Sequence, residues 1–381
     1  MTKARRILLL NERDLRHPAA GGAELHVFEI FSRLAARGAA VRLVSERFPG
    51  SAETEDVRGV RVERVGRVPL YYAHAALAAR SAARRGEIDV VVECLNKLPF
   101  LSPLYVRAPV LALSHHLFGT TAFQEVAFPV AAAVWAAERA IPRVFRGRPF
   151  LAISESSKRD LVERGVDAER VRVSLCGIHA PEVPFDAETP RPPRLVYFGR
   201  LAHYKRVEVM LEAAARLRPR FPDLEVVVVG RGPAQPRLES VARELGVADC
   251  TRFAGFVSDR ERDALVAAAR VCVCPSEKEG WGLTVIEANA VATPVVAADA
   301  PGLRDSVRHD ETGFLVAPGD VEGFAARIGA LLGDDALWRR MAAAALAWSR
   351  RFDWDASARD MEEAIEAAIA GHADAARRSA A

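Results

Sequence analysis

Two glutamates flank a glycine turn in the segment SEKEGWGLTVIEANA: Glu279 lies before the turn, and Glu287 follows eight positions later. An apolar run, VCVCP, precedes the segment and predicts a strand, and the second half predicts a helix. The N–H groups of Gly282, Leu283 and Thr284 would point out of the helix start, beside both carboxylates. Glu279 could bind the hydroxyls of a sugar and Glu287 those of a ribose. The alternative is a helix that is merely stabilised by an acid near its N-terminus.

A pair of cations follows another predicted strand. In YFGRLAHYKR the strand ends at Gly199, Arg200 comes next, and a helix is expected to begin near Lys205. Cations at the carboxyl end of a strand, beside a helix N-terminus, would hold a diphosphate. Without a bound anion these cations would oppose the helix dipole. The alternative to a diphosphate site is that both are solvated surface cations.

Glycines follow two further predicted strands. Gly21 and Gly22 lead into a helix after the first strand, and Gly230 opens a G-x-G after VVVV. Glycine lets a ligand approach the backbone, and the N–H groups of a helix start favour an anion. Both patterns are also typical of ordinary turns, so neither identifies a site alone.

Short apolar runs alternate with helical segments on both sides of residues 179–194, a stretch with five prolines that predicts a linker. This alternation is typical of parallel sheets covered on both faces. We therefore predict an α/β chain with two Rossmann-like, doubly wound parallel-sheet domains that face a cleft, with ligands at the carboxyl ends of the strands. The N-terminal domain spans 1–185 and is joined by a terminal helix at about 354–371, and the C-terminal domain spans 194–350. In the first domain the predicted helices are 23–38, 72–86 and 125–140.

Composition excludes several classes of protein. The net charge is only +3, so no nucleic-acid partner is predicted, and 48 of the 53 basic residues are Arg, so a single Arg carries little information. The five cysteines contain no C-x-x-C, which predicts neither a disulfide framework nor a zinc site. The D-x-D at 353–355 fits a helix start better than a metal site. The basic residues near the N-terminus are followed only by ILLL, which is too short for a signal peptide, and no apolar run approaches the ~20 residues of a spanning helix, so a cytoplasmic protein is expected.

Together these segments resemble the retaining nucleotide-sugar transferases of glycosyltransferase family 4, which have the GT-B fold. The resemblance rests on GGAE at 21–24, on FGRLAHYKR, and on SEKEGWGLTVIEANAVATPVVAADAPGLRD, in which seven residues separate the two glutamates. It implies a retaining, metal-independent hexosyltransferase that moves a sugar from a nucleotide diphosphate to an acceptor hydroxyl, in glycan, glycolipid or natural-product glycoside synthesis. No cofactor is expected; a UDP-sugar is the preferred donor and a GDP-sugar the alternative.

The resemblance also implies roles for individual residues. Glu279 would contact the donor sugar and Glu287 the ribose, while Arg200 and Lys205 would hold the diphosphate. In the N-terminal domain the active-site histidine would be His115, with His116 as the alternative, and Gly22 would approach the donor phosphate. The segment at Phe256 and Val257 would contact the base. The remaining expected donor contacts are Gly21, Gly199, Gly230, Gly280, Trp281, Gly282, Leu283 and Thr284.

The sequence argues against two other enzyme classes and leaves one non-catalytic alternative. A dehydrogenase would need G-x-G-x-x-G after a strand, and the chain has none. A phosphorylase would need a cofactor lysine late in the chain, and no Lys follows Lys278. A non-catalytic regulator or scaffold that binds sugar nucleotides has no need of the whole set of acids, cations and histidine, and it remains the alternative.

The acceptor side is less clear from the sequence. Segment 125–150 mixes Phe128, Trp135 and Phe145 with four arginines. It could lie on an anionic membrane surface, at the inner face, or it could be a core-facing helix that ends in solvated arginines. The sequence does not predict an oligomeric state.

Overall fold

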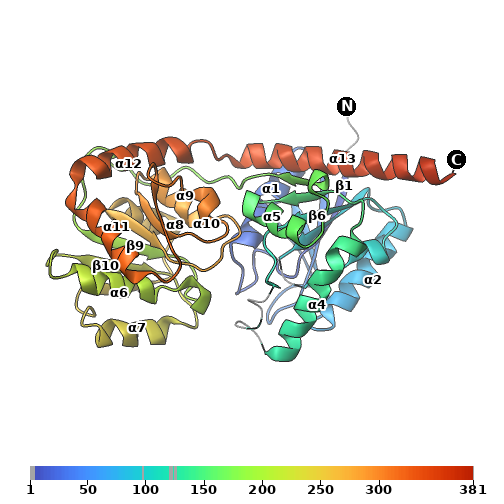
Figure 1. The fold of residues 1–381 in the computed structure, drawn as a ribbon. Coiled ribbons are helices and arrows are strands. Elements are labelled where there is room, and N and C mark those ends of the chain that lie inside the picture. Colours follow the sequence, from blue (N-terminus) through green and yellow to red (C-terminus); the bar gives the residue numbers. More distant parts are fainter. Residues whose placement is uncertain (1–4, 97, 120–122, 124–126, 381) are drawn as a thin grey trace. The chain divides into compact units, whose positions relative to one another are not determined.

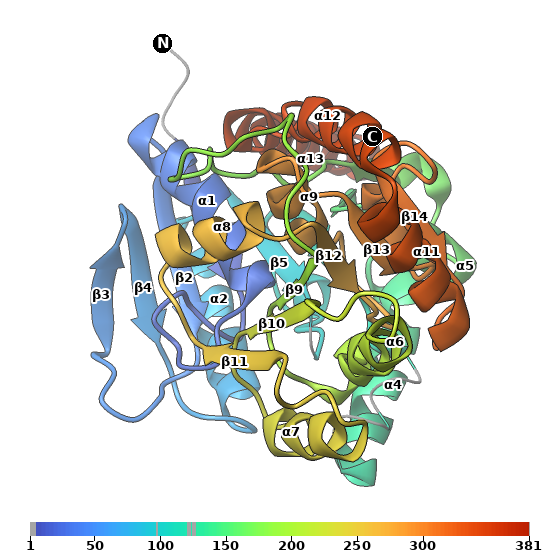
Figure 2. The ribbon, with the colours of Figure 1, turned by 90° about the vertical axis from the view of Figure 1, so that its left-hand side faces the viewer.

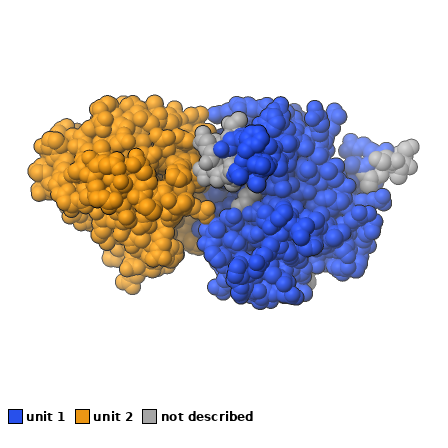
Figure 3. Space-filling model, turned by 90° about the horizontal axis from the view of Figure 1, so that it is seen from below, with its two compact units in different colours: residues 1–177, 354–381 blue, residues 178–353 orange. Residues whose placement is uncertain are grey.

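The computed structural model describes residues 5–96, 98–119, 123 and 127–380. The chain divides into two compact units, shown in two colours in Figure 3. Unit 1 consists of residues 1–177 and 354–381, and unit 2 consists of residues 178–353.

The proline-rich stretch 179–194, which the sequence analysis interpreted as a linker, lies within unit 2. Arg191 is buried and donates hydrogen bonds to the carbonyl oxygens of Ala269 and Val291, at 2.9 and 2.6 Å. Its guanidinium also stacks on the Trp338 ring. The prolines restrict this stretch, and one buried arginine holds it to the body of unit 2.

In the part of unit 1 that is described, eight strands form one sheet in the order β3-β4-β2-β1-β5-β6-β7-β8. Central strands such as β1 and β5 are apolar runs buried on both faces, as expected for a parallel sheet covered by helices. The strands are β1 (Arg6–Leu10), β2 (Ala40–Ser45), β3 (Thr54–Val57), β4 (Val60–Arg64), β5 (Val90–Leu95), β6 (Val110–Ser114), β7 (Phe150–Ala152) and β8 (Val171–Val173).

Helices cover both faces of this sheet. The helix α1 packs beside the terminal helix α13, while α2 and α4 lie on the opposite face (Figure 1). The helical segments are α1 (Gly22–Ala36), α2 (Tyr71–Arg84), α4 (Phe128–Val144), α5 (Glu155–Glu163) and α13 (Trp354–Ala380), with short 3-10 turns at Ser102–Leu104 and Ala168–Arg170. Residues 125 and 126 of the predicted third helix lie outside the described residues.

The sheet of unit 2 is parallel throughout and has the order β11-β10-β9-β12-β13-β14. One face carries α6, α7 and α11, and the other carries α8 and α9 (Figure 2). The strands are β9 (Arg194–Phe198), β10 (Glu225–Val229), β11 (Thr251–Gly255), β12 (Val271–Cys274), β13 (Val295–Ala298) and β14 (Gly313–Val316). The helices are α6 (Glu208–Leu217), α7 (Gln235–Glu244), α8 (Asp259–Ala267), α9 (Leu283–Ala290), α10 (Leu303–Ser306), α11 (Val321–Gly333) and α12 (Asp335–Ser349), with a 3-10 turn at His203–Lys205. The predicted α/β class with two doubly wound domains is confirmed.

None of the helices in the described part of the chain is both long enough and apolar enough to cross a bilayer.

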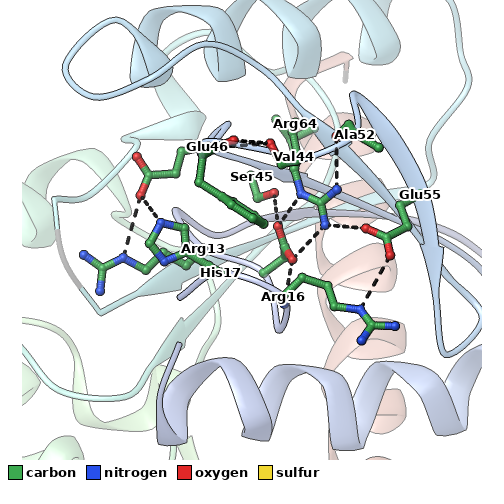
Figure 4. Close-up of polar contacts among 12 residues, drawn as sticks. Arg13, Arg16, His17, Val44, Ser45, Glu46, Ala52, Glu55 and Arg64 are labelled. Atoms are coloured by element: carbon green, nitrogen blue, oxygen red, sulfur yellow. Dashed lines mark hydrogen bonds and ion pairs between the residues drawn. The ribbon is translucent and has the colours of Figure 1, made fainter. Parts of the chain in front are cut away.

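A buried ion pair holds the loop that follows β1 in unit 1 (Figure 4). Asp14 in that loop and Arg64 at the end of β4 are both fully buried, with Nε to Oδ2 at 2.8 Å and Nη2 to Oδ1 at 3.0 Å. Ser45 donates a third hydrogen bond to Asp14, and Glu55 accepts one from Arg64. Burial disfavours the ionised carboxyl, but Arg64 holds the pKa of Asp14 below its ordinary value. The loop is thus fixed through a strand that is distant in sequence.

Replacing Arg64 with Met is expected to destabilise the protein by about 3–5 kcal/mol, because it leaves the Asp14 carboxylate buried without its partner. The matched control is Arg61→Met on the same strand, because the Arg61 side chain is 67% exposed. That control is expected to change stability by no more than about 0.5 kcal/mol. Guanidinium unfolding of the full chain measures both, and equal losses for the two variants would contradict the role given to the buried pair.

Candidate active site

The loops that carry the predicted cations and acids leave the same edge of the unit 2 sheet. Strands β9 and β12 are parallel neighbours, with Leu195 opposite Val271 and Val196 opposite Cys272. The carboxyl ends of parallel strands lie at one edge, so the loops after Phe198 and after β12 emerge side by side.

An ion pair joins these two loops. Lys205 Nζ lies 2.5 Å from Glu279 Oε1, and both side chains are largely withdrawn from solvent. Alongside it, the amide of Glu277 donates to the carbonyl oxygen of Tyr204 at 2.9 Å, and Arg206 pairs with Glu277 at 3.0 Å. Burial opposes the Lys205 ammonium, yet the neighbouring Glu279 raises the pKa of Lys205 above its ordinary value. Lys205 is therefore an ammonium group near pH 7, paired with Glu279 at this edge.

Arg200 lies in the same loop as Lys205, and its side chain is exposed. Its carbonyl oxygen accepts a hydrogen bond from the Tyr197 hydroxyl at 2.9 Å, which ties the loop back to β9.

The start of α9 adds backbone amides to this edge. Gly282 caps the helix with φ of 86°, a conformation that favours glycine, and a Cβ there would lie 2.6 Å from Ser306 Oγ. Glu279 precedes the cap, and its amide donates to the carbonyl oxygen of Pro301 at 3.0 Å. The first N–H groups of a helix have no partner within it, so Leu283 and Thr284 can direct theirs to an anion.

Trp281 has a structural place within the turn. Its side chain is 3% exposed, and its ring packs against Phe352 with centroids 5.4 Å apart. Any donor contact at this position would therefore come from the backbone, as it would at Gly280.

Glu287 is the fifth residue of α9, one turn after the helix start, and lies beside Arg262 of α8, with Oε1 3.5 Å from Nη1. Burial raises the pKa of Glu287, while the positive charge of Arg262 acts in the opposite direction. Arg262 could not be predicted as a site residue, because nothing in the sequence distinguishes it from the many other arginines.

The glycines after β9 and β10 are explained by close packing of backbone. A Cβ on Gly230 would lie 1.9 Å from the carbonyl oxygen of Gly199. Gly230 donates to the carbonyl oxygen of Gly255 at 2.7 Å, and Gly199 donates to that of Val229 at 3.0 Å. These contacts require glycine whether or not a nucleotide also approaches.

Phe256 follows β11 directly, and it is 77% exposed, although it is a large apolar residue. Val257 beside it is half-buried. An aromatic ring presented to solvent at a strand end is suited to stack on a flat ligand such as a nucleobase.

In unit 1, Gly21 caps α1 and Gly22 is its first residue. The amide of Gly21 donates to the Glu24 carboxylate at 2.7 Å, so an acid of the helix's own first turn already lies at this N-terminus.

The two adjacent histidines of unit 1 differ in environment. His115 is 2% exposed, and its Nε2 lies 3.1 Å from Nδ1 of the buried His26. Burial lowers the pKa of His26 to about 4, so it is neutral near pH 7, and a proton on one of the two facing nitrogens links the rings. The Trp354 ring packs against His26, with centroids 5.8 Å apart. His116 is only half-buried, and its ring lies against Phe118.

Helix α4 of unit 1 buries Ala131, Glu138 and Ile141 but exposes apolar residues. Phe128 is 73% exposed, and Val130 and Trp135 are also exposed.

The described residues contain no group of three or more His, Cys, Asp or Glu side chains placed to hold a metal ion. In the D-x-D pattern, Asp355 pairs with Arg37 at 3.0 Å and Arg33 at 3.4 Å.

Comparisons with known proteins identify the family. Residues 20–182 match the family described as Glycosyltransferase Family 4, and residues 182–348 match the family described as Glycosyl transferases group 1. The chain is 37% identical over 209 residues to a glycogen synthase of Mycobacterium tuberculosis, covering 54% of this chain and 50% of that protein. It is 29% identical over 415 residues to a D-inositol 3-phosphate glycosyltransferase of Streptomyces scabiei, covering 97% and 93%. The chain thus spans about half the length of relatives such as the glycogen synthase, and nearly all of the Streptomyces scabiei transferase.

Solved structures share the fold. A sucrose-phosphate synthase from Thermosynechococcus elongatus matches with a TM-score of 0.79 at 23% identity, covering 96% of this chain and 99% of that one. HepE of Anabaena, solved with UDP-glucose, matches with a TM-score of 0.76 at 21% identity, covering 95% and 100%. The two Rossmann-like units therefore have the GT-B fold. The chain belongs to glycosyltransferase family 4.

Proposed function

We propose that the protein is a retaining glycosyltransferase that moves a sugar from a nucleotide diphosphate to an acceptor hydroxyl, as in glycan, glycolipid or natural-product glycoside synthesis. The observation that carries the proposal is the Lys205–Glu279 pair at the carboxyl edge of the unit 2 sheet, beside the start of α9. A cation, an acid and helix amides at one sheet edge suit a ligand that has both phosphates and hydroxyls.

Lys205, Arg200 and the first amides of α9 would stabilise the charge that develops on the departing diphosphate. Such preorganised donors contribute about 3–4 kcal/mol each in known enzymes. Glu279, the partner of Lys205, would accept hydrogen bonds from the sugar once the phosphates take over the lysine. Attack from the face of the departing phosphate would retain the anomeric configuration, and none of these residues' roles requires a metal.

UDP is the first nucleotide to test and GDP the second. HepE, which has the same fold, was solved with UDP-glucose, and exposed Phe256 offers a stacking surface for either base. The five cysteines are free thiols, in keeping with a cytoplasmic protein.

The experiment compares Glu279→Gln with Glu277→Gln in the same loop, where Glu277 pairs with Arg206 instead. Glu279→Gln removes the counter-charge of Lys205 without removing the lysine, so UDP binding should persist or tighten. Transfer from a UDP-sugar should fall by about 100-fold or more, because the acid that holds the sugar is lost. Calorimetry and a sugar-transfer assay measure the two effects.

Glu277→Gln should leave both properties close to wild type. Unchanged transfer in Glu279→Gln would remove Glu279 from the mechanism. Binding of nucleotide sugars by the wild type without transfer to any hydroxyl acceptor would favour the non-catalytic regulator or scaffold.

We also propose that α4 of unit 1 contacts an anionic membrane surface. In support, Phe128 and Trp135 are exposed, and Arg139 lies over the Trp135 ring at 4.4 Å. Exposed Arg143 and Arg146 follow in the chain and would attract acidic lipids.

The double variant Phe128→Ser/Trp135→Ser is therefore expected to reduce co-sedimentation with vesicles of acidic phospholipid, because it removes the apolar side chains that would enter the interface. Phe256→Ser, which removes an equally exposed aromatic residue from unit 2, is the control and should sediment like wild type. Failure of the wild type to sediment with acidic vesicles at low salt would exclude this contact.

A further inference from the structure

Helices α8 and α9 of unit 2 place an arginine against the acid expected to hold the donor's ribose. Arg262 Nη1 lies 3.5 Å from Glu287 Oε1, and each side chain is 24% exposed. At this distance the two groups interact through charge, without a short hydrogen bond.

The hydrogen bonds of Arg262 go instead to two acids of its own helix. Its Nη1 donates to Asp259 Oδ1 at 2.8 Å, and its Nη2 and Nε donate to Asp263 Oδ1 at 2.8 and 3.1 Å. Asp263 is buried and also accepts the amide of Glu182 at 3.1 Å. The guanidinium is thus held from one side and presents its charge to Glu287 from the other.

Glu287 depends on this charge because its surroundings otherwise disfavour a carboxylate. Burial raises its pKa, and the two aspartates raise it further, while Arg262 has the largest opposing effect. The charged or titratable groups that face Glu287 are Arg262, Asp259, Asp263, His179 and Cys272.

We propose that Arg262 is a positioning residue that holds the Glu287 carboxylate as a double acceptor for the two ribose hydroxyls, so that the site prefers ribonucleotides over 2′-deoxyribonucleotides. The inference rests on the proposed nucleotide-sugar function. An ionised carboxylate accepts two hydroxyl hydrogen bonds, whereas a protonated carboxyl offers a donor in place of one acceptor. Because the guanidinium is satisfied by Asp259 and Asp263, it stabilises the charge of Glu287 without occupying the oxygens that the ribose needs.

The preference for the ribonucleotide should depend on pH, because it requires the ionised form of Glu287. The ribose preference is present above the pKa of Glu287 and is lost as the pH falls through it. Removing the Arg262 charge raises that pKa further, so the preference should be lost at a higher pH than in wild type. If the role of Arg262 were purely structural, its replacement would weaken the binding of both nucleotides equally. The pH at which the preference for UDP is lost would then not change.

The test measures binding of UDP and of 2′-deoxy-UDP by calorimetry between pH 5 and pH 8, a range of about three units around neutrality. Wild type should prefer UDP by about tenfold or more at pH 8, as expected for a hydrogen bond to a charged group. Arg262→Gln should lose this preference at a higher pH than wild type, and Arg262→Lys, which keeps the charge, should restore it. Arg260→Gln is the matched control, because Arg260 is exposed on the same helix.

Three outcomes are distinguishable. If wild type binds neither nucleotide nor GDP, the proposed function fails. If wild type prefers UDP but Arg262→Gln has the same ratio of UDP to 2′-deoxy-UDP affinity as wild type at every pH, the inference about Arg262 is overturned while the proposed function stands. A wild type that binds both nucleotides equally also overturns it. If Arg262→Gln does not fold, the double variant Arg262→Gln/Asp263→Asn, which removes one charge of each sign, takes its place. It too should lose the preference for UDP at a higher pH than wild type.

Discussion

A lysine ammonium that is largely removed from water needs a negative partner, and in unit 2 this requirement shapes the site. Lys205 is brought beside Glu279 because β9 and β12 are parallel neighbours whose loops leave the same edge. Glu279 pairs with the ammonium group of Lys205, which stays charged beside the start of α9. An anionic ligand can take the place of the carboxylate as the partner of Lys205, and Glu279 then needs other hydrogen-bond donors, such as sugar hydroxyls. The same principle operates at Glu287, whose cation, Arg262, comes from the neighbouring helix.

Unit 1 uses some of its buried polar groups differently, to hold loops in place. The Asp14–Arg64 pair anchors the loop after β1. The buried Glu93 accepts the amides of Phe100 and Ser102 at 2.7 and 2.9 Å, which shapes the chain after β5. His26, whose ring faces His115, is kept neutral near pH 7 by its burial. These contacts hold the described parts of two loops at the carboxyl edge of the unit 1 sheet.

Much of the fold could be predicted because buried parallel strands are continuous apolar runs. The strands predicted before the loops at Arg200, at Gly230 and at Glu279 are β9, β10 and β12. The hairpin of β3 and β4 was missed because TEDV and VRVER are polar, short and stabilised at the sheet edge by tertiary contacts. The segments that form the site could be recognised because glycines, cations and acids follow predicted strands in the sequence. Arg262 was not, because its role depends on the packing of α8 against α9. Nor could the sequence distinguish His115 from His116, since their difference in burial is set by His26 and Trp354.

The central claim is that unit 2 recognises the diphosphate of a nucleotide. Titration calorimetry of the full chain with UDP and with uridine, at low and high salt, tests it most directly. UDP is expected to bind about 100-fold or more tightly than uridine, because the diphosphate engages Lys205, Arg200 and the α9 amides. This difference in affinity should narrow as salt screens exposed charge. Equal affinities for UDP and uridine, or binding of neither UDP nor GDP, would contradict it.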